Sequence, residues 1–266
     1  MSLSVPIIVR NAVKLRYPLS RVVWGVIGLA DEVVVSVDPE SEDDSLDYVY
    51  DIMLEINAKY PGLVRYIESE WDMGNVSSTG LEFARQTNIA IDNCKGDWIF
   101  SIQADESIHE NDFGEIKKLI KEADSMDIDA YFMTRLYFYG DMDTIRDDWT
   151  VPIVRLFRKG TRVSCGDAMN TSGSDKVSYC DVPIYHYSRI GDPDIISKRI
   201  LSLDKFFHPR EKLLEEHELK PYDFNTRNFD CMHKDGVDVG KKEVGEVFSI
   251  FTGTHPKAFA GYRGWV

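Results

Sequence analysis

Two hydrophobic patterns alternate along the first half of the chain. Short runs rich in apolar residues predict strands over residues 5–10, 32–38, 63–68 and 97–102. The run at 32–38 is nearly all apolar, which is typical of a strand covered on both faces. Between these runs, apolar side chains recur at helical spacing over residues 18–30, 41–60 and 81–93. The strand-helix alternation predicts a doubly wound α/β sheet, mostly parallel, with right-handed crossovers.

The second half is less regular. Its pattern predicts helices over residues 111–125 and 195–207. It also predicts strands over residues 130–138, 151–158 and 182–187, and the strand at 130–138 could pair antiparallel. Beyond Pro209 the periodicity is weak. We therefore expect a main domain at residues 1–208, with halves that meet near residue 106, and a less regular helical extension at 209–266. The stretch from about Pro221 is expected to wrap over the main domain.

Turn-forming residues mark the expected ends of the helices. Ser41 or Asp43 is expected to cap the helix that Pro61-Gly62 ends, and Ser78 or Thr79 to cap the helix over residues 81–93.

Composition narrows the function classes. The 266 residues carry a net charge of −14, which argues against a nucleic-acid binder that works by neutralising phosphates. No apolar run approaches the roughly 18 to 20 residues that span a bilayer, and no basic start with an apolar core suggests a secretory leader. The four cysteines form no Cys-x-x-Cys pair, so we expect reduced thiols in a cytoplasmic protein.

Charged side chains follow the expected strands. Asp105 and Glu106 come after the strand at 97–102, Asp38 ends the strand at 32–38, and Arg10 and Asn11 end the strand at 5–10. Because ligands bind beyond the carboxyl ends of such strands, this edge predicts a site where a divalent cation and a phosphate-bearing substrate meet. The alternatives are a solvated acidic loop at Asp105 and Glu106, and a simple turn at Asp38-Pro39.

Further candidates come from other segments. Arg85 could fork onto phosphate oxygens, or could pair on the helix surface with Glu82. His186 could complete a metal shell or be a packing residue, and Arg189 could neutralise a leaving diphosphate. Asp167 could be a general base.

Aromatic residues cluster between residues 131 and 149. They could form a platform on which an acceptor sugar stacks, although such clusters more often belong to a core. The cluster contains Tyr131, Phe132, Tyr137, Phe138, Tyr139 and Trp149.

Several segments, in order, resemble the GT-A-fold glycosyltransferases of family 2 over about residues 5–205. The matching segments are Val9-Arg10-Asn11, Val37-Asp38-Pro39-Glu40-Ser41-Glu42-Asp43, Gln86-Thr87-Asn88-Ile89-Ala90, Gly96-Asp97-Trp98, Gln103-Ala104-Asp105-Glu106, Val154-Arg155-Leu156-Phe157-Arg158 and Tyr185-His186-Tyr187. The segment ending in Asp105 corresponds to the family's Asp-any-Asp metal motif. Gln103 replaces its first Asp, and an amide there could still contact the ribose.

The resemblance implies an inverting transfer of a sugar from a nucleoside diphosphate to an acceptor hydroxyl, assisted by Mn²⁺ or Mg²⁺. It places the nucleotide-binding half at residues 1–106 and the acceptor half at 107–208. By position, Asp105 and His186 would hold the metal, and Asp167 would be the base. The substrate would contact Arg10, Asn11, Asp38, Arg85, Gln103 and Arg189.

Two other functions stay open on the sequence. A nucleotidyltransferase of similar topology would normally carry a Gly-rich basic loop after the first strand, and residues 9–16 contain no Gly. A sugar- or nucleotide-binding module without catalysis would share the fold, because function resides in the site.

Overall fold

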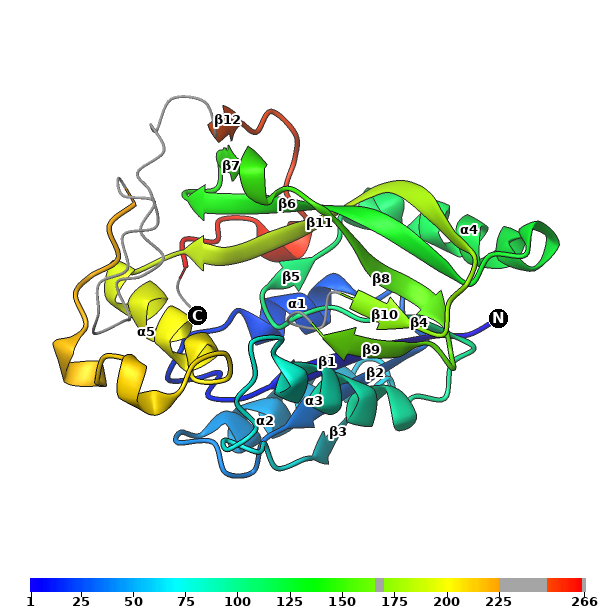
Figure 1. Cartoon of the computed structure of the whole chain (residues 1–266). Helices are drawn as coiled ribbons and strands as arrows, with labels where there is room; N and C mark the ends of the chain where they lie inside the picture. The colour runs from blue at the N-terminus through cyan, green and yellow to red at the C-terminus, as the bar shows by residue number, and fades with distance from the viewer. Residues whose placement is uncertain (166–169, 225–247, 265–266) are drawn as a thin grey trace.

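The computed structural model describes residues 1–165, 170–224 and 248–264. Its first half contains four parallel strands in the order β3-β2-β1-β4. These are β1 (Leu3–Val9), β2 (Glu32–Val37), β3 (Val64–Glu68) and β4 (Trp98–Phe100). The helices that connect them are α1 (Leu19–Gly25), α2 (Ser45–Asn57) and α3 (Leu81–Asp92). The predicted α/β class and the predicted strand-helix order are confirmed (Figure 1).

Helices cover both faces of this sheet. Val33, Val35 and Val37 pack into the large core that includes α1, α2 and α4 (Phe113–Met126). Val34 points to the opposite face, where it joins residues of α3. Alternate side chains of one strand are therefore buried in two different cores, which explains why β2 is apolar at nearly every position.

Antiparallel pairing dominates the second half. β8 (Pro152–Arg158) pairs antiparallel with both β4 and β6 (Ala130–Gly140). The long β11 (Val177–Ile190) runs parallel to β6 and pairs antiparallel with β5 (Glu106–Ser107). The arrowheads of β6 and β11 both point toward α5 (Pro193–Asp204) in Figure 1. The sheet therefore brings these strand ends and α5 to the same side as the expected site.

Short elements complete the described chain. The remaining strands are β7 (Thr144–Arg146), β9 (Arg162–Cys165), β10 (Asn170–Ser172) and β12 (Phe248–Ile250). The 3-10 turns are η1 (Glu110–Asp112), η2 (Asp147–Trp149), η3 (Arg210–Lys212), η4 (Glu216–Glu218) and η6 (Lys257–Phe259). β9 and β10 form a separate two-stranded sheet, in which β9 lies against α3.

The described part of the C-terminal stretch lies against the main sheet. β12 pairs with β7, and Phe259 stacks on Tyr187 of β11 with ring centroids 4.2 Å apart. Phe259 and Tyr262 are both fully buried. These contacts join residues 248–264 to the principal core, while the domain boundary at residue 208 stays a prediction.

Two local predictions change in detail. α3 has Gly80 at its N-cap, with a φ of 61° that favours glycine. The hydroxyl of Ser77 accepts a hydrogen bond from the amide of Leu81. The expected caps, Ser78 and Thr79, are therefore wrong: the N-cap is Gly80, and the hydroxyl that accepts a hydrogen bond from the helix is that of Ser77. At α2, Asp43 accepts the amide of Ser45, while the residue at the N-cap position is Asp44.

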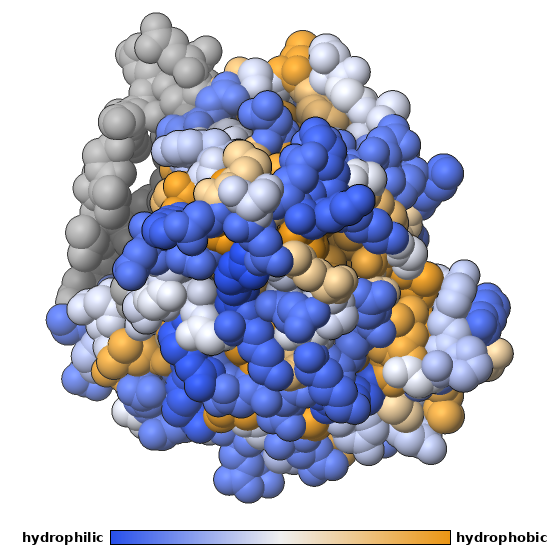
Figure 2. Space-filling model, turned by 90° about the vertical axis from the view of Figure 1, so that its right-hand side faces the viewer, coloured by the Kyte–Doolittle hydropathy of each residue, from blue (hydrophilic) through white to orange (hydrophobic). Residues whose placement is uncertain are grey.

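The surface matches a chain with many charged residues. The face in Figure 2 is mostly hydrophilic, with hydrophobic side chains in patches that are largest at the right of the view. Within the described residues, every helix is too short or too polar to cross a bilayer. Cys94 and Cys180 are buried free thiols, and burial raises the pKa of Cys94 to about 12.

Candidate active site at the carboxyl edge of the sheet

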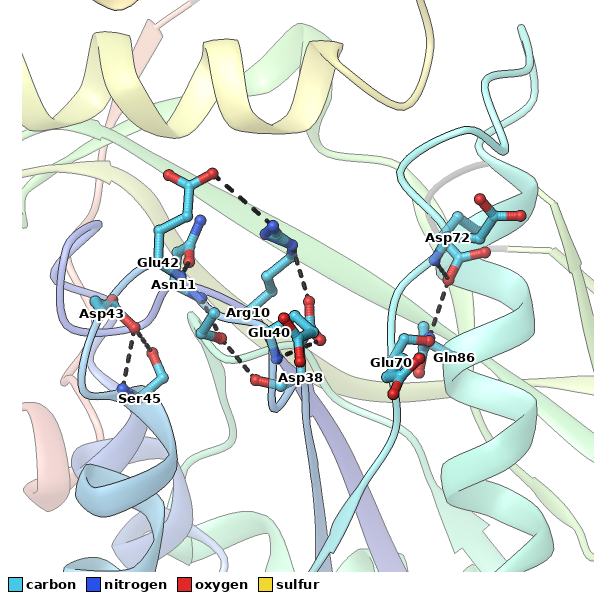
Figure 3. A network of polar contacts seen from close by, with 12 residues as sticks. Arg10, Asn11, Asp38, Glu40, Glu42, Asp43, Ser45, Glu70, Asp72 and Gln86 are labelled. Carbon is cyan, nitrogen blue, oxygen red and sulfur yellow. Dashed lines mark hydrogen bonds and ion pairs between the residues drawn. The ribbon is translucent and has the colours of Figure 1, made fainter.

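Arg10 and Asp38 meet where two neighbouring strands end. The register pairs Val9 of β1 with Val37 of β2, so the residues that follow are adjacent. Arg10 Nε lies 3.0 Å from Asp38 Oδ2, and Figure 3 shows the Arg10 side chain between Asp38 and Glu42. Burial raises the pKa of Asp38, although the amide of Glu40 and the charge of Arg10 oppose this. Asp38 therefore belongs to a turn, as the alternative interpretation holds, and also takes part in a buried ion pair with Arg10.

Asn11 plays a structural part in this corner. It has a left-handed φ of 52°, and its side-chain oxygen accepts the amide of Glu42 at 2.7 Å. Its own amide donates to the hydroxyl of Ser41. Because these bonds fix the turn after β1 against the turn after β2, Asn11 does not line the cavity described below. The substrate contact expected at Asn11 stays a prediction beside this structural role.

Asp105 and His186 form the second polar pair. His186 in β11 is paired with Glu106 in β5, and the amide of Tyr187 donates to the carbonyl of Asp105. Asp105 Oδ1 lies 3.5 Å from His186 Nε2. Burial favours the neutral carboxyl, but His186, Arg199 and Arg189 outweigh it and lower the pKa of Asp105. Burial also lowers the pKa of His186, so the pair is a carboxylate beside a neutral imidazole.

Glu106 is engaged elsewhere. It is fully buried, and its two oxygens accept from Nε and Nη2 of Arg155 at 2.9 and 2.8 Å. One of these oxygens also accepts the amide of Gln103. Burial opposes ionisation of Glu106, but Arg155 overcomes it and lowers the pKa. The acidic-loop alternative is wrong for Glu106, because the side chain clamps the loop that carries Asp105.

A cavity of about 380 Å³ lies between these groups. Its polar lining includes Arg10, Gln103, Asp105, His186 and Arg189. Its aromatic and aliphatic lining comes from Val9, Leu15, Tyr17, Trp71, Phe83, Tyr137, Trp149, Leu203 and Phe206. A mostly apolar hollow with a few convergent polar groups is the usual form of a small-molecule site.

The aromatic cluster predicted as an acceptor platform is divided. Tyr137 and Trp149 line the cavity with ring centroids 4.6 Å apart. Tyr131 and Phe138 belong to the core, as the alternative interpretation holds. Alternate residues of β6 face opposite sides, which separates the members of one sequence cluster.

Arg85 lies apart from the cavity. Its guanidinium donates to both carboxylate oxygens of Glu82 and to the carbonyl of Glu70. The ion pair with Glu82 weighed in the sequence is therefore present, because Glu82 stands one helical turn earlier, although its side chain is fully buried rather than on the surface. Asp167, the expected base, lies outside the described residues.

Two buried arginines of the cavity escaped the sequence analysis. Arg135 of β6 and Arg199 of α5 are buried and line the cavity. Each occupies an inward position of an element whose inward neighbours are apolar. The sequence signal that could have found them is a charged residue at a position where the pattern of the strand or helix predicts a buried apolar one. Burying such a charge is costly unless it has a functional or structural partner.

Comparisons with known proteins add only distant similarity. No protein-family model matches the chain, and no curated protein matches it. Among solved structures, residues 1–349 of S. aureus TarS align over 82% of this chain and 68% of TarS 1–349, with 14% identity and a TM-score of 0.44. The same protein in complex with UDP-GlcNAc gives a TM-score of 0.42 at 14% identity, over 82% of this chain and 69% of that one.

A third similar structure is the mannosyltransferase PcManGT from Pyrobaculum calidifontis, in complex with GDP-Man and Mn²⁺. It aligns over 50% of this chain and 35% of its own length, with 15% identity and a TM-score of 0.38. Similarity this distant does not identify a function, so the function has to be inferred from the cavity of this chain.

Proposed function

We propose that this protein is a glycosyltransferase that moves a sugar from a nucleoside-diphosphate sugar to an acceptor hydroxyl, with inversion at the anomeric carbon. One observation carries the proposal: a single cavity at the carboxyl edge of the sheet joins Arg10, which is held by Asp38, to the Asp105–His186 pair. Such an edge is where α/β proteins bind nucleotides.

The nucleoside is proposed to occupy the end near Arg10. Trp71, Phe83 and Phe206 pack edge-on against one another there and offer apolar surface to a base. Asp38 lies behind Arg10 and is not part of the cavity wall. Its proposed role is therefore to hold the Arg10 guanidinium toward the nucleotide.

The transfer is proposed to take place near Asp105, with the acceptor alongside Tyr137 and Trp149. The acceptor oxygen attacks the anomeric carbon, the bond from that carbon to the diphosphate oxygen breaks, and the nucleoside diphosphate leaves with the bonding electrons. A carboxylate base takes the acceptor's proton. Asp167 stays the proposed base from the sequence.

The cation implied by the resemblance fits the described residues poorly. Asp105 and His186 would hold it, but no third His, Cys, Asp or Glu joins them in the described chain. Glu106 is bound by Arg155, and the positive charges of Arg199 and Arg189 already act on Asp105. Hard divalent cations favour several oxygen ligands, so the proposed transfer includes no cation.

A nucleotide-sugar panel tests the proposal directly. The purified chain is incubated with uridine, guanosine and other nucleoside-diphosphate sugars, and the released nucleoside diphosphate is measured. We expect slow release from at least one donor, because water can replace the acceptor. Binding of a nucleoside diphosphate without release from any donor would instead identify a binding module, and a complete lack of binding would refute the proposal.

Asp38→Asn is expected to weaken nucleoside-diphosphate binding by roughly tenfold, since a close charge pair couples by about 1.5 kcal/mol or more. The reason is that the neutral amide no longer holds Arg10 in place. Titration calorimetry with the best nucleotide from the panel measures the change. Asp44→Asn, in the same connection but without an ion pair to Arg10 among the described residues, serves as the matched control. Equal affinities in both variants would contradict the role given to Asp38.

A further inference from the structure

The cavity carries more buried positive charge than its carboxylates balance. Four arginines line it: Arg10, Arg135, Arg189 and Arg199. Arg10 is paired with Asp38. For the other three, the described residues contain no carboxylate oxygen within 4.0 Å of the guanidinium.

The three unpaired arginines are not equivalent. Arg199 donates to the main-chain carbonyls of Leu15, Ser188 and Arg16, which satisfies its guanidinium and ties α5 to the segment after β1. Arg135 and Arg189 are only 8% and 7% exposed, and the Nε of each has no hydrogen-bond partner within the described part of the chain. A buried cation without a counter-charge costs several kcal/mol.

Aromatic rings surround these two guanidiniums. Arg135 lies 5.6 Å from the centre of the Tyr137 ring, and Arg189 lies 5.8 Å from the centres of the Trp149 and Tyr222 rings. Rings attract a cation weakly but do not neutralise it. The two side chains therefore keep their full positive charge in a dry setting, where an anion would be bound strongly.

Asp148 of the cavity wall is paired with Arg146, and the other acidic side chain in the described wall is Asp105. It stands 3.5 Å from His186 and lies in the fields of both Arg189 and Arg199. A divalent cation placed on Asp105 and His186 would add to an existing excess of positive charge. A diphosphate, by contrast, would complement it.

We propose that Arg135 and Arg189 bind the diphosphate of the donor directly and stabilise it as it leaves, so that this protein needs no divalent cation. This inference rests on the proposed function. When the bond between the anomeric carbon and the diphosphate oxygen breaks, the negative charge that develops on that oxygen is taken up by the two guanidiniums. No other co-reactant is required.

Titration calorimetry in excess EDTA provides the test, with inorganic pyrophosphate and a series of nucleoside diphosphates as probes. We expect both kinds of probe to bind, with Kd values that Mn²⁺ changes by less than about threefold. Arg135→Met and Arg189→Met are each expected to weaken binding by roughly tenfold to a hundredfold, the effect of losing a hydrogen bond between charged groups. Arg162→Met, which removes an exposed arginine outside the cavity, is the matched control and should bind as the wild type does.

A thermal readout separates an anion site from a structural role. Because Met replaces a buried charge with no carboxylate within 4.0 Å among the described residues, Arg135→Met and Arg189→Met should melt no lower than the wild type without ligand. Arg189→Lys retains the charge but loses the planar fork, so it should keep part of the affinity. Melting well below the wild type, with unchanged pyrophosphate affinity in the folded fraction, would show that the arginines are structural.

The possible failures are distinguishable. If a nucleoside diphosphate binds with Mn²⁺ but not in EDTA, the inference is wrong while the proposed function stands. If pyrophosphate binds in EDTA but no nucleoside diphosphate does, the anion site stands and the proposed function fails. If no probe binds under either condition, both are wrong.

Discussion

Glu106→Gln is expected to lower the free energy of unfolding by about 3 to 5 kcal/mol, the usual effect of removing one partner from a buried ion pair. Arg155 is 1% exposed and would be left as an unpaired cation in the core. The neutral amide also binds the main chain of Gln103 less strongly than the carboxylate does. Urea denaturation followed by circular dichroism measures the loss.

A double variant provides the control for this prediction. Glu106→Leu combined with Arg155→Met removes both charges, and apolar replacements of a buried pair are often neutral or stabilising. The double variant should therefore be more stable than Glu106→Gln. If both variants lose the same stability, packing rather than charge is responsible.

The same pair predicts acid sensitivity. Because the folded-state pKa of Glu106 lies below its ordinary value of 4.5, its contribution is complete above that value. It is lost as the pH falls through the lower, folded-state pKa. Glu106→Gln should lack this component, so the stability difference between wild type and variant should shrink as the pH falls below about 4.5. A difference that does not depend on pH would show that Glu106 is not ionised in the folded protein.

Asp105→Asn is expected to reduce sugar transfer by roughly a hundredfold, the loss typical of misplacing a group beside the reacting atoms. The Asp105 carboxylate lies 3.5 Å from Nε2 of His186. A carboxylate at this place favours the tautomer with the proton on Nε2, whereas an amide could favour the other tautomer. The substitution also removes a negative charge beside Arg189, so diphosphate affinity should rise or stay unchanged while turnover falls.

Turnover and binding are therefore measured separately for Asp105→Asn, by product release and by calorimetry. Asp124→Asn, at an exposed ion pair with Arg158, provides a matched Asp-to-Asn control outside the cavity. An Asp105→Asn variant with full turnover would remove Asp105 from the reaction. A parallel loss of binding and turnover would indicate a disrupted cavity.

Much of the first half of the fold was predictable because its signals are local. The apolar runs that became β1, β2 and β4 are bounded by turn residues, and their order fixes a parallel sheet through the handedness of the crossovers. The meeting of Arg10 with Asp38 follows from the same logic, since adjacent parallel strands end at one edge. The proximity of Asp105 to His186 was expected only from the family resemblance, because their strands are far apart along the chain.

Side-chain direction was the part that the sequence left open. Asp105 and Glu106 are neighbours, yet one lines the cavity and the other binds Arg155, which lies 49 residues later. Arg85 and Arg189 looked equally able to bind phosphate, but only Arg189 reaches the cavity. Which side chain faces a site depends on how each strand or helix is rotated against its neighbours, and those contacts come from distant segments.

The sequence by itself determined the α/β class, the order of strands and helices in the first half, and the edge at which polar groups collect, because hydrophobic period and turn residues act over short distances. Only the tertiary structure decided the charge balance of the cavity. Arg135 comes from β6, Arg189 from β11 and Arg199 from α5, and their approach to Asp105 is fixed by packing between elements that no local pattern connects. Electrostatic energy depends on those distances and on burial, so the excess of buried positive charge becomes visible only in three dimensions.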